Sequence, residues 1–98
     1  MNLPLIISAE ARADFDEAAG WYGERSATLG DRFIDAVRDA LNQIRAAPDF
    51  YGIVWKDVRC ALVRQFPYAV YFHVRPEGVV VIAVIHTKRD PRVWQRRV

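Results

Sequence analysis

Hydrophobic positions follow a helical repeat in the first half of the chain and a strand-like repeat in the second half. A short apolar run at residues 3–7 ends at Ser8, a candidate helix cap. Apolar side chains then recur at helical spacing from Ala11 to Tyr22. A cleaner apolar stripe runs from Leu29 to Ile44 and stops before Pro48. The pattern therefore predicts a short first strand followed by two amphipathic helices in a hairpin.

The second half of the chain predicts three strands. Residues 48–57 read as an irregular connection, and the strands follow at Val58–Gln65, Tyr68–Arg75 and Val79–His86. The last strand is apolar on both faces, which indicates a central position in the sheet. We therefore expect one α+β domain over residues 1–98, in the order β-α-α-β-β-β, with the helical hairpin packed on one face of a mainly antiparallel sheet.

Charge is divided unevenly between the two halves. The net charge is only +2, but residues 1–57 carry six Lys/Arg against ten Asp/Glu, whereas residues 58–98 carry eight against two. The basic excess gathers around the end of the last predicted strand, where His86-Thr87-Lys88-Arg89 leads into a tail with further arginines and Trp94. Side chains just past a buried strand are held in place and still reach solvent. This junction is therefore a candidate site for a phosphate-rich or acidic partner.

Several classes of function are disfavoured by the composition. Cys60 is the single cysteine, so a disulfide framework or a cysteine zinc site is not expected. Glycine-rich phosphate signatures and a His-Glu-x-x-His motif do not occur in the sequence, and we expect neither a metal nor a cofactor. The longest apolar run, Val79–Ile85, is too short to span a bilayer, and the N-terminus does not read as a signal peptide. These observations predict a cytoplasmic protein without a membrane segment.

Three individual side chains have expected roles that follow from the strand pattern and its flanks. Trp94 is expected to pack its ring on the sheet and so to anchor the tail, and His73 is expected to be exposed to solvent. Asp90 is expected to cap the segment that follows or to pair with an arginine.

Three segments resemble the RelE/ParE superfamily of toxins from bacterial type II toxin–antitoxin modules, of the plasmid-stabilisation type. They are the Gly30-Asp31-Arg32-Phe33 run at the second helix, the strand pair from Val58 to Phe72, and the run from Val84 to Trp94. The resemblance covers nearly the whole chain. It implies a growth-inhibiting toxin that a cognate antitoxin neutralises, with operator DNA contacted only through the antitoxin.

The resemblance leaves two targets open, because ParE-like members inhibit DNA gyrase and RelE-like members cut mRNA on the ribosome. By the resemblance, Arg64 and Arg89 match family arginines that could clamp a phosphate, and Lys56 and Arg59 could replace other basic residues of the family. We also assign Lys88 and Arg92 to target or phosphate binding.

The family's C-terminal tyrosine is missing, and Trp94, near its place, cannot transfer a proton. Only His86 is a candidate catalytic acid or base, and it falls before the family's usual position. We therefore predict the ParE-like, gyrase-binding mechanism, with the mRNA endonuclease as the alternative.

Overall fold

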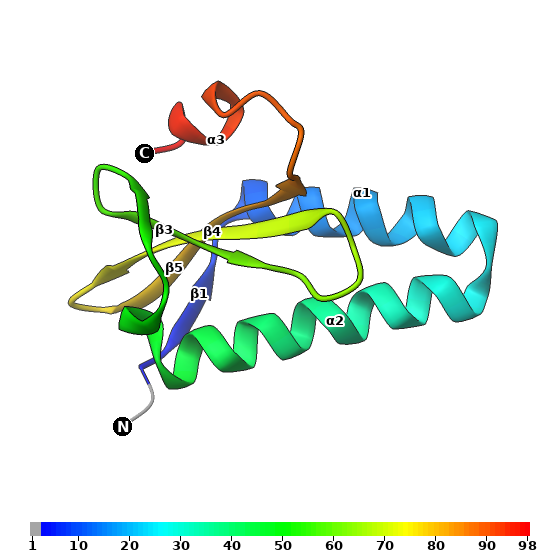
Figure 1. Cartoon of the computed structure of the whole chain (residues 1–98), viewed down its shortest axis with the longest axis horizontal. Helices are drawn as coiled ribbons and strands as arrows, with labels where there is room; N and C mark the ends of the chain where they lie inside the picture. Colours follow the sequence, from blue (N-terminus) through cyan, green and yellow to red (C-terminus); the bar gives the residue numbers. More distant parts are fainter. Residues whose placement is uncertain (1–2) are drawn as a thin grey trace.

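The fold is a sheet with a helical hairpin on one face and a short C-terminal helix on the other (Figure 1). A computed structural model describes residues 3–98. The elements, in chain order, are β1 (Leu5–Ile7), α1 (Ala9–Arg25), α2 (Ala27–Ala46), a 3-10 turn η1 (Pro48–Phe50), β2 (Ile53–Trp55), β3 (Val58–Leu62), β4 (Tyr68–Arg75), β5 (Gly78–His86) and α3 (Arg92–Gln95).

The sheet has the strand order β1-β5-β4-β3-β2. The β1–β5 pair is parallel, and the other three pairs are antiparallel. The predicted fold class is therefore confirmed, and the last strand lies inside the sheet between β1 and β4, whereas β4 is its middle strand. Strand β2 and helix α3 were not predicted, because each is too short to show a repeat. The third strand ends at Leu62 rather than at the predicted Gln65, whose positive φ of 69° is incompatible with an extended strand.

Two serines begin the helices of the hairpin. The Ser8 hydroxyl accepts a hydrogen bond from the Ala11 N–H at 3.1 Å, as predicted for a cap. Ser26 ends α1 by donating its N–H to the Tyr22 carbonyl, and its hydroxyl accepts from the Leu29 N–H at 3.3 Å. One residue thus turns the chain from α1 into α2 and satisfies backbone groups of both helices.

The main core lies between the hairpin and the sheet. Phe33, Val37 and Ile44 of α2 are buried against Val70 and Phe72 of β4 and against residues of β5. A second cluster covers the opposite face of the sheet, where Trp94 is 4% exposed and stacks on Tyr71 with ring centroids 4.4 Å apart. The predicted anchoring of the tail by Trp94 is confirmed. Within residues 3–98, no helix is long and apolar enough to cross a membrane.

The prediction that His73 is exposed was wrong. His73 is 8% exposed, because β4 has a neighbour on each side and the turn between β2 and β3 brings Asp57 close to the ring. Its Nδ1 atom lies 3.8 Å from an Asp57 carboxylate oxygen and has no hydrogen-bond partner. Burial lowers the pKa of His73, and the neighbouring Arg75 guanidinium lowers it further.

Candidate functional site

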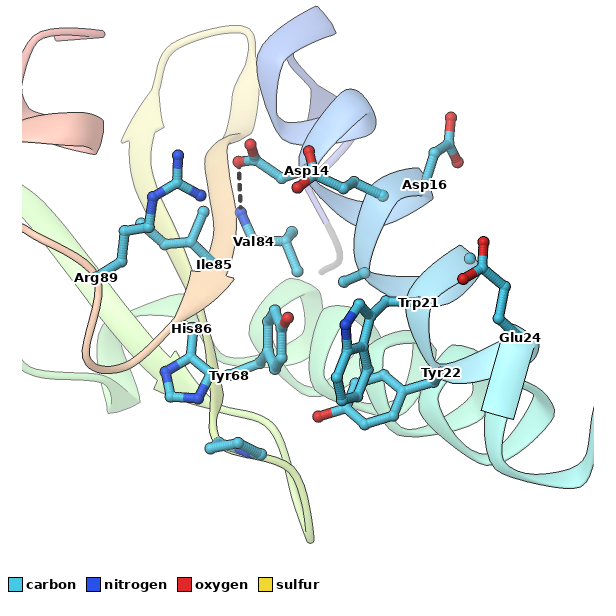
Figure 2. Close-up of a pocket in the computed structure, with 14 residues that line it drawn as sticks. Asp14, Asp16, Trp21, Tyr22, Glu24, Tyr68, Val84, Ile85, His86 and Arg89 are labelled. Atoms are coloured by element: carbon cyan, nitrogen blue, oxygen red, sulfur yellow. Dashed lines mark hydrogen bonds between the residues drawn. The ribbon is translucent and has the colours of Figure 1, made fainter. Parts of the chain in front are cut away.

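A groove of about 820 Å³ lies between α1 and the C-terminal end of β5. One wall is formed by α1 side chains, including Asp14, Trp21 and Tyr22, and the other is formed by the ends of β4 and β5 and the residues after them. Figure 2 shows His86 and Arg89 on the β5 side, the Tyr68 ring beside His86, and Trp21 on the α1 side. The groove therefore contains the strand-to-tail junction that the sequence indicated.

His86 sits at the mouth of this groove in a defined orientation. Its ring packs edge-on to Tyr68, with centroids 5.5 Å apart, and its Nδ1 accepts a hydrogen bond from the Lys88 N–H at 3.1 Å. A nitrogen that accepts this bond carries no proton, so in the neutral ring the proton is on Nε2. To act as a general base through Nδ1, the ring would have to break its bond to the turn.

The cations after β5 differ in their surroundings. Arg89 lines the groove, and Lys88 is exposed on the same turn. The Arg92 guanidinium binds both Asp90 carboxylate oxygens, at distances from 2.7 to 3.2 Å, and the Arg92 N–H also donates to Asp90. These bonds lower the pKa of Asp90 to about 2. The expected pairing of Asp90 is confirmed, and the Arg92 charge is already compensated within the turn.

Of the predicted binding residues, only Arg89 lines the groove, and Arg59 and Arg64 also lie away from the turn after β5. Arg59 on β3 donates to the Tyr51 carbonyl at 2.6 Å and lies 3.8 Å from an Asp49 carboxylate oxygen. Its side chain is about one-fifth exposed and ties β3 to the segment before β2. Arg64 is exposed in the β3–β4 connection and lines a separate hollow with Asp35 and Asp39 of α2. The structure thus brings His86 and Arg89 together and places Arg59 and Arg64 elsewhere.

The α1 wall of the groove was missed by the sequence reasoning. Asp14, Glu17, Trp21 and Glu24 recur every three or four residues and line the groove. This stripe can be seen in the sequence, but an acidic face of a helix usually faces solvent and has no binding role. Burial raises the pKa of Tyr68, so its hydroxyl keeps its proton at neutral pH.

A largely buried ion pair lies beside the groove, where Asp14 lines its α1 wall. The Arg97 guanidinium binds Asp14 at 2.6 and 3.1 Å and also donates to the Ile82 carbonyl at 3.0 Å. Asp14 in turn accepts from the Val84 N–H at 3.1 Å, the bond drawn in Figure 2. The C-terminal tail is thereby fixed to both walls of the groove.

Comparison with known proteins places the chain in a family. The family model described as "ParE toxin of type II toxin-antitoxin system, parDE" matches residues 5–91. No curated protein of matching sequence was found. A solved structure, "Chromosomal ParDE TA system from P. aeruginosa", superposes with a TM-score of 0.76 at 12% identity, over 86% of this chain and 95% of that chain. That likeness shows the shared fold, whereas the match over residues 5–91 shows the family. The chain belongs to the ParE toxin family of type II toxin–antitoxin systems.

Proposed function

We propose that this protein is the toxin of a type II toxin–antitoxin module, that it arrests growth by binding DNA gyrase, and that a cognate antitoxin neutralises it. The family match over residues 5–91 carries this proposal. The similar solved structure is that of a ParDE system, which supports an antitoxin as the natural partner. Operator DNA is contacted through that antitoxin, and the cytoplasm, where gyrase works, is the expected compartment.

The chemistry of the groove favours binding over RNA cleavage. Cleavage at a 2′-hydroxyl needs a base for the nucleophile, an acid for the leaving oxygen and cations for the phosphate. Here the Nδ1 of His86 already accepts from the Lys88 N–H, Tyr68 keeps its proton, and Arg92 is paired with Asp90. The α1 wall adds carboxylates that repel a phosphate chain. Shape and charge are sufficient for an inhibitor that only binds.

The endonuclease alternative retains one favourable observation, because His86, Tyr68 and Arg89 share one groove. In that case His86 would be the catalytic residue, and ribosome-dependent mRNA cleavage would be lost in His86→Ala.

The proposal is tested by expression in a bacterial host with and without the neighbouring gene of its operon. We expect growth arrest from the toxin alone and rescue by co-expression of a small neighbouring antitoxin. Unimpaired growth at a confirmed level of intact protein would contradict a toxin function. Rapid loss of mRNA, abolished in His86→Ala, would instead support the endonuclease.

A further inference from the structure

Two carboxylates of the groove wall carry uncompensated charge. Asp14 is bound by Arg97, and Asp16 lies 3.6 Å from the Arg12 guanidinium. Within residues 3–98, Glu17 and Glu24 form no such ion pair, although both line the groove. A partner that enters here meets two free negative charges along α1, and a cationic side chain would be attracted to them.

Gly20 lies on the same wall and has no role within the fold. It is an exposed residue in the middle of α1, where glycine destabilises a helix relative to alanine. A Cβ built on Gly20 meets no atom within 4 Å, so neither packing nor backbone conformation requires glycine. The open space above Gly20 is what a second backbone needs in order to approach the helix closely.

Trp21, next to Gly20, offers the apolar part of the surface. Its side chain is 50% exposed, and Figure 2 shows it in the groove beside Tyr68. Half-exposed tryptophans in hollows are typical anchor points of protein–protein contacts. The Arg25 guanidinium carbon lies 3.2 Å from the centroid of the Trp21 ring, so this ring already binds one cation.

We propose that the groove receives an extended segment of the target protein, which crosses α1 at Gly20, packs an apolar side chain on Trp21 and places an arginine or lysine beside Glu17, one turn away. This inference rests on the proposed function as a binding toxin and specifies the chemistry of the bound segment. The free carboxylates favour a protein partner over a nucleic acid, since a phosphate chain would be repelled from the same wall.

Growth arrest by the full chain tests the inference before the contact segment of the target has been identified. The groove variants are Glu17→Arg, which reverses one free charge, and Gly20→Leu, which fills the approach path. The controls are Glu77→Arg in the β4–β5 turn and Asn42→Leu on α2, both at exposed positions outside the groove. Circular dichroism melts and immunoblots of all variants confirm folding and equal expression.

We expect the inducer level that halves the growth rate to rise at least about tenfold for each groove variant, because like charges or lost contact in an interface weaken binding strongly. The two controls should match the wild type. If both groove variants arrest growth at the same inducer level as the wild type, this inference is overturned and the proposed toxin function is not affected. Stronger arrest by Glu17→Arg would also overturn it, since removal of a repelling carboxylate aids a nucleic-acid ligand.

Two further outcomes separate this inference from the proposed function. If the wild type does not arrest growth, the toxin function and the inference both fail. If groove variants lose arrest but purified wild-type protein does not bind immobilised gyrase, the groove is confirmed as the contact surface and gyrase is rejected as its partner.

Discussion

Asp14 and Arg97 are 83 positions apart in the chain, yet they form a bidentate ion pair at the outer edge of β5. Strand β1 pairs with β5 only along Val79–Val81. Beyond Val81, the Arg97 guanidinium donates to the Ile82 carbonyl, and the Asp14 carboxylate accepts from the Val84 N–H. The pair therefore satisfies backbone groups that the short first strand leaves open. It also fixes the tail to the first helix.

The first prediction concerns the loss of one partner of this pair. Arg97→Met should lower the free energy of unfolding by about 2–4 kcal/mol, because it leaves the largely buried Asp14 carboxylate unpaired. Urea denaturation measures the change, and Arg96→Met on the exposed neighbouring arginine is the control. A double variant, Arg97→Met with Asp14→Leu, should lose less than the single variant. An Arg97→Met protein as stable as the control would contradict the structural role of the pair.

Alanine substitutions at two glycines should change the stability of the protein in opposite directions. A Cβ on Gly30 would lie 2.9 Å from the Gly23 Cα, where α1 and α2 approach closely. Gly30→Ala should therefore destabilise the protein by about 1–3 kcal/mol. Gly20→Ala meets open space and should stabilise the helix by up to about 1 kcal/mol. Thermal unfolding of both variants checks this, and equal effects at both positions would disprove the close contact.

His73 should make stability depend on pH. Its pKa is lowered in the folded protein, by burial and by Arg75, although Asp57 and Glu77 act in the opposite direction. The unfolded chain therefore binds the proton more readily, and stability should fall as pH drops below the ordinary value of about 6.5. His73→Gln should flatten this decline between about pH 7 and about pH 5, whereas His86→Gln should retain it. If the decline in stability persists unchanged in His73→Gln, other titratable groups cause it and His73 does not.

Alanine substitutions at Arg89 and Arg59 should affect different properties, the first toxicity and the second stability. Arg89→Ala should relieve growth arrest and change stability by less than about 0.5 kcal/mol, because the side chain is exposed in the groove. Arg59→Ala should mainly destabilise the protein, because it removes the contacts to Tyr51 and Asp49. Growth assays and denaturant unfolding measured on both variants provide the comparison. Full toxicity of Arg89→Ala would remove this residue from the contact surface.

The fold was largely predictable because its long elements carry complete hydrophobic repeats. The α2 stripe and the two long strands β4 and β5 spanned enough residues to fix their type and order. Strand β2 and helix α3, with three and four residues, carry no such signal. The burial of His73 depends on a turn from elsewhere in the chain, which an alternating pattern within β4 does not reveal.

The candidate site was only partly predictable. The cations after β5 stood out as a cluster in the sequence, and Arg89 and His86 do share the groove. Arg59 was assigned to binding through the family resemblance, but its partner Asp49 precedes β2, and only the folded sheet brings the two together. The acidic α1 wall opposite Arg89 follows from the packing of α1 on β5, which charge counts along the chain do not show.

Gyrase supercoiling in the presence of the purified protein tests the central claim most directly. Relaxed plasmid, ATP and gyrase are incubated with increasing amounts of toxin, and the topoisomers are separated on a gel. We predict dose-dependent inhibition that is relieved by the cognate antitoxin, while mRNA on translating ribosomes stays intact under the same conditions. Unaffected supercoiling together with ribosome-dependent mRNA cleavage that His86→Ala abolishes would contradict the account.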